Sequence, residues 1–144
     1  MVLETAAGRL TRIDRGAPPR VLASGLSSPV GLARRGTGWV VAEPDGGRVV
    51  AVHEGAPLTL VASQLAQPSG LAVTLGGQIW VAEVGTGSLL RIETDGARSV
   101  IVDRLALSRP RGLHPHPVAM AIDADGRLLI APPGDGSVLA VATP

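Results

Sequence analysis

The feature that most constrains this chain is a motif that returns four times with the same internal spacing. Residues 39–52, "WVVAEPDGGRVVAV", recur as "IWVAEVGTGSLLRI" at 79–92 and as "LLIAPPGDGSVLAV" at 128–141, and a shorter copy, "MVLETAAGRLTRI", stands at 1–13. Each copy is an apolar run, a short turn of constant length that ends in a glycine, and a second apolar run. A spacing that is held four times indicates a repeat protein, in which each unit is one supersecondary structure.

The last unit carries an insertion. The signal Pro-x-Gly-Leu precedes the motif at 29–32, 68–71 and 110–113. The glycines of the first two copies of this signal, Gly31 and Gly70, are 39 residues apart. The alanines that precede the turn in the last two copies of the motif, Ala82 and Ala131, are 49 residues apart. Residues 117–121, "PVAMA", keep the usual distance to Ala131. We therefore predict that the copy at 110–113 is displaced into a loop at 108–117, "SRPRGLHPHP".

Each full unit is predicted to form four short strands. In the middle unit these are 70–73, 79–82, 89–92 and 99–102, which are rich in Val, Ile and Leu and are separated by turns that contain glycine. Four strands in about 40 residues are typical of a β-propeller blade, and blades must stack because one blade cannot bury both of its faces. The alternative is a β-sandwich with accidental internal similarity, which the fixed spacings disfavour.

The predicted fold is therefore all-β, with blades of four antiparallel strands in one domain at 1–144. We name the strands of a blade A to D from the centre outward. The chain then contains strands B-C-D of one blade, two complete blades and strands A-B-C of a last one, which is about 3.5 blades. Their approximate limits are 1–28, 29–67, 68–109 and 117–144, with the insertion loop at 108–117.

Composition excludes several classes of protein. There is no cysteine, so disulfides and cysteine-ligated metal sites are absent. All 13 basic residues are arginine, they are scattered, and the net charge is +1, which argues against a nucleic-acid partner and against a basic membrane patch. No apolar run approaches the roughly 20 residues that span a bilayer. The start has no signal-peptide pattern, so a soluble protein is expected, with its compartment undetermined.

The stretch "PSGLAVTLGGQIWVAE" and the run through "LLRIETDG" resemble blades of the NHL-repeat, SMP-30/gluconolactonase-like and streptogramin-lyase-like propellers. This resemblance covers nearly the whole chain. It implies a ring of six or sometimes seven blades, with a ligand or an active site where the central channel opens on one face. It assigns no metal ligand here, because metal sites in the lactonase-like branch combine acidic residues with an asparagine and this chain has no asparagine. No cofactor is identified, and a divalent metal has no motif to support it.

A ring of six blades would need about 240 residues, more than the 144 present. One possibility is a four-bladed ring in which the two partial ends merge. Another is that the chain is a piece of a longer protein. The interpretation we favour is self-association, in which two chains join head to tail and complete one ring, because free strand edges are normally covered or paired. A homo-oligomer is therefore expected.

The insertion contains the main candidates for chemistry. Because strand direction alternates, the B–C turns and the D-to-A connections share one face, here called the B–C face, and the A–B and C–D turns share the other, the A–B face. The insertion lies on the B–C face, where His114 and His116 are candidate general acid–base residues and Arg109 and Arg111 are candidate ligands for an anion. The competing interpretation is a solvated loop that is stiffened by its prolines.

Glu43 and Glu83, at the ends of two B strands, are further candidate ligand-binding residues on the same face. The competing interpretation is structural, because a carboxylate at a strand end commonly accepts hydrogen bonds from backbone N–H groups of the next turn. Trp39 and Trp80 are offset by one position in the aligned strands, so they are predicted to face opposite sides of their blades and to pack between blades.

Two functions remain open at this point. The first is a non-catalytic propeller that acts as a binding or assembly module and associates with itself into a closed ring. The alternative is a lyase or lactone hydrolase that acts on a small molecule at the mouth of the channel. The first is favoured from the residues alone, because no catalytic constellation recurs in the sequence.

Overall fold

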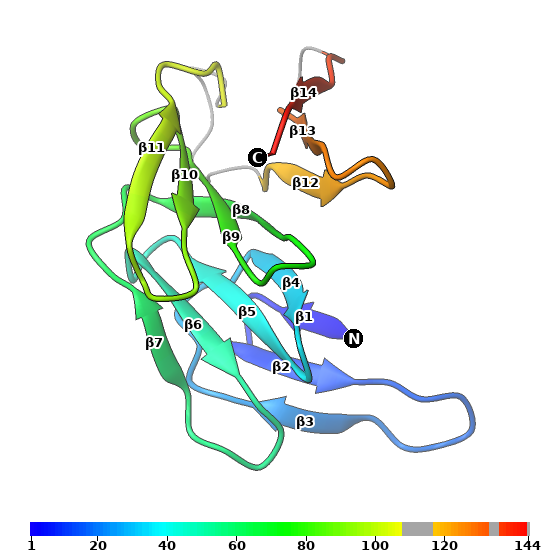
Figure 1. The fold of residues 1–144 in the computed structure, drawn as a ribbon. Coiled ribbons are helices and arrows are strands. Elements are labelled where there is room, and N and C mark those ends of the chain that lie inside the picture. The colour runs from blue at the N-terminus through cyan, green and yellow to red at the C-terminus, as the bar shows by residue number, and fades with distance from the viewer. Residues whose placement is uncertain (108–116, 133–135, 144) are drawn as a thin grey trace.

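The protein folds into four antiparallel sheets arranged around a common centre (Figure 1). The computed structural model describes residues 1–107, 117–132 and 136–143, and within these ranges it contains strands and no helix. The sheets are β1-β2-β3, β4-β5-β6-β7, β8-β9-β10-β11 and β12-β13-β14, each with its strands in chain order. The all-β prediction and the predicted sequence of partial, full, full and partial blades are confirmed.

The bounds of the strands follow the repeat. The first sheet contains β1 (Val2–Glu4), β2 (Arg9–Arg12) and β3 (Arg20–Ala23), and the last contains β12 (Ala119–Ile122), β13 (Leu128–Ala131) and β14 (Leu139–Val141). The second contains β4 (Gly31–Arg35), β5 (Gly38–Glu43), β6 (Arg48–Val52) and β7 (Thr59–Ala62). The third contains β8 (Pro68–Val73), β9 (Ile79–Glu83), β10 (Ser88–Ile92) and β11 (Arg98–Val102).

The innermost strands β4, β8 and β12 lie side by side at the centre, and the glycine of Pro-x-Gly-Leu explains how they come so close (Figure 1). A Cβ atom on Gly31 would lie 2.4 Å from the carbonyl oxygen of Ser69, and one on Gly70 would lie 2.7 Å from that of Val118. Ala119 occupies the same register in β12, but it is exposed. The glycine is therefore required where another inner strand packs against the position.

Three apolar clusters fill the spaces between consecutive sheets, and the two tryptophans lie in two of them. Trp39 packs with Leu10 and Leu26 between the first and second sheets. Trp80 is fully buried with Leu128 and other residues between the third and fourth sheets. Each ring faces an arginine side chain of its own sheet, Arg34 at 5.4 Å from Trp39 and Arg91 at 5.9 Å from Trp80. The prediction that the two side chains face opposite sides of their blades and pack between blades is confirmed.

A β-bulge recurs at the same place in the first three sheets. The register between strands C and D shifts after Leu10, Val49 and Leu89, which are the second residues after the repeated glycines. Bulges increase the local twist of a strand pair. The same local change of twist is therefore expected at this point in each of the three sheets.

The repeated glycine joins each blade to the connection that leaves it. Gly8, Gly47, Gly87 and Gly136 all have positive φ, between 55° and 72°. The carbonyl oxygens of the first three accept the amide N–H of Leu26, Leu65 and Leu105, at 2.9, 2.9 and 2.7 Å. A Cβ atom on Gly87 would lie 2.6 Å from the carbonyl oxygen of Leu105. Each of these three glycines therefore has a backbone conformation that favours glycine and a close backbone neighbour.

We predict that Gly87→Ala destabilises the protein more than Gly55→Ala. Gly55 has a φ of 73°, close to the 71° of Gly87, but has open space around it. Gly55→Ala should cost about 1–2 kcal/mol, the usual cost of left-handed backbone for an L-residue. Gly87→Ala should add the cost of overpacking, about 1–3 kcal/mol. Denaturant unfolding of both variants measures the difference. Equal free energies of unfolding would show that the close contact between Gly87 and the carbonyl oxygen of Leu105 does not matter for stability.

Candidate functional site

The two glutamates that were candidates for ligand binding are held in structural hydrogen bonds. Glu43, the last residue of β5, is completely buried, and its Oε1 accepts the backbone N–H of Ser27 at 2.5 Å while Arg48 Nε donates to Oε2. Glu83, the last residue of β9, accepts the N–H of Ala66 at 2.8 Å and the hydroxyl of Thr86 at 3.1 Å. Both carboxylates thus bond the connection that enters their own blade, and ligand binding by them stays a prediction.

This geometry differs in one respect from the structural interpretation based on sequence. We expected each carboxylate to accept N–H groups from the turn that follows it, but the amides of Ser27 and Ala66 belong to the connection from the preceding blade. The difference arises because stacking brings that connection against the strand end, whereas only the hydroxyl of Thr86 comes from the following turn. The glutamate therefore joins two blades.

Glu4 stands at the equivalent position in the first sheet and has different partners. Its carboxylate accepts two hydrogen bonds from the Arg9 guanidinium, at 2.8 and 2.7 Å, and one from the Thr11 hydroxyl at 2.5 Å. The Arg9 hydrogen bonds, and then that of Thr11, lower the pKa of Glu4 below its ordinary value. Glu4 is therefore a charged group that faces away from the second sheet.

His114, His116, Arg109 and Arg111 lie outside the described residues. The two described ends of their segment are anchored: Leu107 and Val118 are buried in the same cluster between the third and fourth sheets. The backbone N–H of Val118 also donates to the Ser69 hydroxyl at 3.2 Å. The chain thus leaves and returns beside the inner strands on the B–C face, where the sequence analysis expected the insertion.

A cavity of about 580 Å³ opens on the B–C face between the first two sheets. Its walls come from the β1–β2 turn, the connection into β4 and the β5–β6 turn. The Thr5 hydroxyl, on its wall, donates to the carbonyl oxygen of Pro29 at 2.8 Å, and Asp45 is exposed at its rim. The lining residues are Thr5, Ala6, Ala7, Gly8, Leu26, Ser28, Val30, Pro44 and Asp45.

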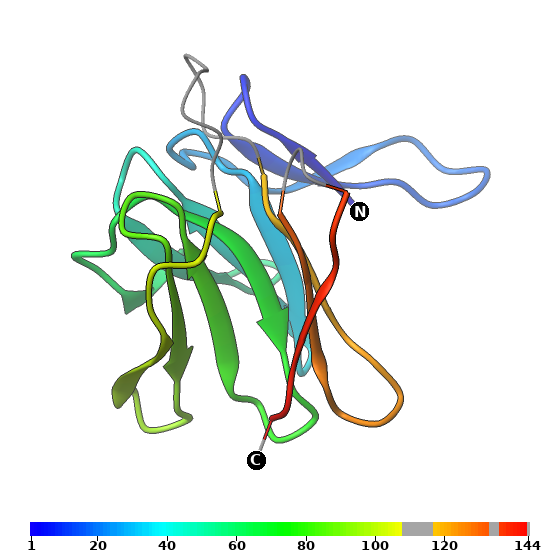
Figure 2. The same cartoon turned by 90° about the horizontal axis from the view of Figure 1, so that it is seen from above.

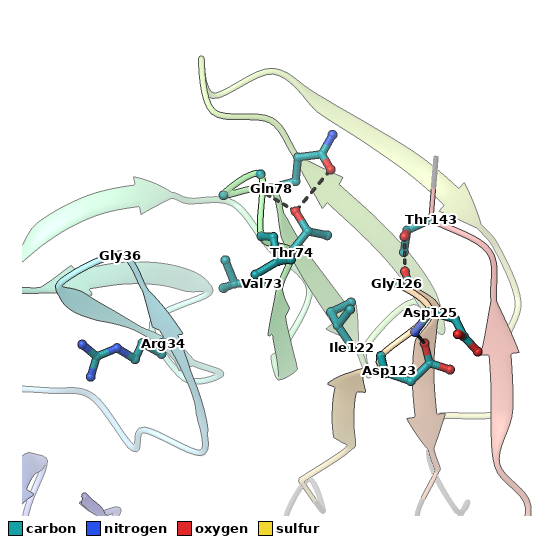
Figure 3. Close-up of a pocket in the computed structure, with 14 residues that line it drawn as sticks. Arg34, Gly36, Val73, Thr74, Gln78, Ile122, Asp123, Asp125, Gly126 and Thr143 are labelled. Carbon is teal, nitrogen blue, oxygen red and sulfur yellow. Dashed lines mark hydrogen bonds between the residues drawn. The ribbon is translucent and has the colours of Figure 1, made fainter.

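A larger cavity, of about 910 Å³, lies on the opposite side of the fold, on the A–B face (Figure 3). Its walls are the A–B hairpins of three successive sheets, together with Thr143 after β14. Arg34 projects from one hairpin and Asp123 and Asp125 from another (Figure 3). From the sequence, we predicted these hairpins only as turns. The sequence signal that could have predicted this cavity was the presence of polar residues in successive A–B turns. Such residues are also usual in solvated turns, so the signal is not specific.

The polar groups of this cavity are mostly paired with one another. Thr74 and Gln78 bond each other across the β8–β9 turn, and Gln78 Nε2 donates to Glu93 at 2.9 Å. Asp123 accepts the N–H groups of Arg127 and Asp125 and the guanidinium of Arg127 at 2.8–2.9 Å. The backbone hydrogen bond from Arg127, followed by the side-chain bond and charge of the same residue, lowers the pKa of Asp123. The Asp-x-Asp-Gly turn is therefore satisfied by its own arginine.

In the part of the chain that the structure describes, no group of three or more His, Cys, Asp or Glu side chains is arranged to hold a metal ion. In the same residues, no helix is long and apolar enough to cross a membrane.

No protein-family model matches the chain, and no curated protein matches it in sequence. Solved structures match it by fold. Virginiamycin B lyase from Staphylococcus aureus superposes with a TM-score of 0.71 at 16% identity, over 97% of this chain and 47% of the lyase. A gluconolactonase from Xanthomonas campestris superposes with a TM-score of 0.66 at 21% identity, over 92% of this chain and 44% of that one.

A nidogen/laminin complex also matches, with a TM-score of 0.69 at 20% identity over 86% of this chain and 49% of that one. For the lyase, a variant in which one histidine is replaced by alanine is catalytically inactive. The chain thus has the fold that the sequence resemblance implied, and it spans about half the length of these proteins.

The pairing of Asp123 predicts a pH-dependent contribution to stability. Because its pKa is lowered in the folded state, the contribution is present above the ordinary carboxyl range, near pH 4, and is lost as pH falls through the lowered value. We expect Asp123→Asn to lower the melting temperature at pH 7, and we expect the difference from the wild type to shrink as the pH is lowered toward 2.

The control for this prediction is Asp125→Asn, which removes a carboxylate of the same turn that is 75% exposed and has one ion pair with Arg127. An exposed pair contributes little, so this variant should change the melting temperature by less at pH 7. A gap between wild type and Asp123→Asn that is the same at pH 7 and pH 2 would show that charge pairing is not its cause.

Proposed function

We propose that this chain forms part of a propeller enzyme, a lyase or a lactone hydrolase, that acts on a small molecule where the channel opens on the B–C face. The observation that supports this proposal is the fold match along nearly the whole chain to a lyase and to a gluconolactonase. Since the chain spans about half of each, further blades would complete the channel that holds the substrate.

The chemistry of both reactions requires a general base and a group that stabilises negative charge on a carbonyl oxygen. The glutamates of the B–C face are engaged, because Glu43 and Glu83 already accept two hydrogen bonds each. The insertion therefore supplies the candidates. His114 or His116 would take a proton from water or from the substrate carbon, and Arg109 and Arg111 would stabilise the developing oxyanion.

The B–C face also offers a space of suitable size. The cavity of about 580 Å³ between the first two sheets lies within the range of roughly 300–1,000 Å³ that is usual for small-molecule pockets. Its walls combine apolar side chains with Thr5, Ser28 and Asp45 as the polar groups. Such a wall suits a substrate that has both apolar and polar parts and carries an ester or lactone group.

The experiment is to incubate the protein with gluconolactone and with virginiamycin B, with and without Mg²⁺ or Ca²⁺, and to compare wild type with His114→Ala/His116→Ala. We expect the double variant to lose about 10²-fold or more in kcat/KM, the usual contribution of a general acid–base residue. The matched control is His53→Ala, which removes an exposed histidine from the β6–β7 turn on the opposite face and should retain activity.

A second function, a non-catalytic binding or assembly module, is favoured by a separate observation. The strand-end carboxylates that repeat in the sequence are used to join blades. A propeller of this fold also occurs in the nidogen/laminin complex. If neither substrate is turned over, and both bind equally to wild type and to the double variant, the enzymatic proposal is overturned and the module remains.

A further inference from the structure

Each sheet in the stack has one face toward the preceding sheet and one toward the next, and the two faces differ. Between the second and third sheets, small and β-branched residues of the second meet larger residues of the third. The next-facing residues of the second sheet are Ala33, Val40, Ala42, Val49 and Ala51, and the previous-facing residues of the third are Leu71, Ile79, Val81, Leu90 and Ile92.

The last sheet exposes a next-facing surface of the same kind. Strand pairing places Ala131 opposite Ala119 as Ala42 is opposite Gly31, so the positions correspond one to one. The surface, which we call the C-terminal face, consists of Ala121, Leu129, Ala131, Val138 and Ala140. Val138 is 64% exposed, whereas its counterpart Val49 is completely buried. This face has the composition that packs against another sheet inside the molecule.

The first sheet exposes its previous-facing surface. The N-terminal face consists of Val2, Glu4 and Ile13 together with Thr11, which is itself buried, and these residues correspond to Val41, Glu43, Val52 and Val50 of the second sheet. Val2 and Ile13 are 41% and 54% exposed, whereas Val41 and Val52 are buried against the first sheet. The face contains a hollow of about 540 Å³. Figure 2 shows this sheet at the edge of the fold, with the β2–β3 hairpin projecting from the body.

The charges on the N-terminal face are compatible with burial in an interface. Glu4 and Arg9 form an ion pair at 2.7 Å. The corresponding pair in the second sheet, Glu43 with Arg48, lies where the second sheet meets the first, and there the glutamate is completely buried. A buried charge is tolerated when it is paired and hydrogen-bonded. The ion pair therefore does not prevent another sheet from covering this face.

We propose that the N-terminal face of one copy of this chain packs on the C-terminal face of a second copy. The occupant is a second copy because the two exposed faces are the counterparts of the faces that meet between consecutive sheets inside the chain. Solved structures with this fold are also about twice as long as this chain, so a second copy would supply the missing length. The contact is heterologous, so it either closes into a ring or continues head to tail. The inference concerns assembly and does not depend on the reaction proposed above.

The test uses one blocking variant for each face. Ala121→Arg places a charge on the C-terminal face and Ile13→Arg places one on the N-terminal face, both at positions that are exposed in the single chain. We expect the wild type to have a mass of twice 14.6 kDa or a higher multiple, and each variant alone to be a folded monomer. An equal mixture of the two variants should form a dimer, because each retains the face that the other has lost.

The control is Leu60→Arg, which changes a residue that is 58% exposed on the outer strand β7, away from both faces, and should assemble as the wild type does. Circular dichroism checks folding, and Ala140→Arg replaces Ala121→Arg if the latter does not fold. A wild type that is a folded monomer would overturn the proposal and assign both faces to other blades. A mixture that stays monomeric, or a dimer that survives Ile13→Arg, would equally overturn it.

Discussion

The stack depends on one backbone hydrogen bond that is repeated in each of the first three sheets. The carbonyl oxygen of Gly8, Gly47 or Gly87 accepts the amide of a leucine in the connection that leaves the same blade. The bond fixes where Leu26 and Leu65 enter the apolar clusters between sheets, since both are buried there. It also fixes where the next inner strand begins. Positive φ at the glycine aims the carbonyl group at the connection, and the absence of a Cβ atom leaves room for it.

The strand-end glutamate completes the same joint from the other side. Glu43 and Glu83 accept the amides of Ser27 and Ala66, the residues directly after the two buried leucines. The connection is thus held by the turn of the blade it leaves and by the strand end of the blade it enters. A carboxylate used in this way is buried and hydrogen-bonded, so it is poorly placed to act as a base or to bind a ligand. The stronger candidates for chemistry are therefore not the repeated glutamates but the residues of the insertion at 108–117, which interrupts the repeat.

The cavities on the two faces of the fold differ in the residues that border them. On the A–B face, the larger cavity is bordered by Asp123, Thr74 and Gln78, whose polar groups already bond residues of their own hairpins. On the B–C face, the smaller cavity is lined by apolar and polar side chains, and the interrupted repeat enters and leaves beside buried Leu107 and Val118. The A–B hairpins are thus largely self-contained, because their polar groups bond within the same turns.

The sequence by itself determined the local structure. Constant spacing, alternating apolar runs and glycine turns were enough to predict four groups of strands, the partial first and last sheets, and the opposite directions of Trp39 and Trp80, because each of these depends on residues within one unit. Only the tertiary structure decided which groups meet between units. The amide bound by Glu43 and the carbonyl oxygen that approaches Gly31 both come from a neighbouring unit, and so does the second wall of each cavity. These contacts depend on the angle and distance at which sheets stack, and a local pattern of residues does not encode that geometry.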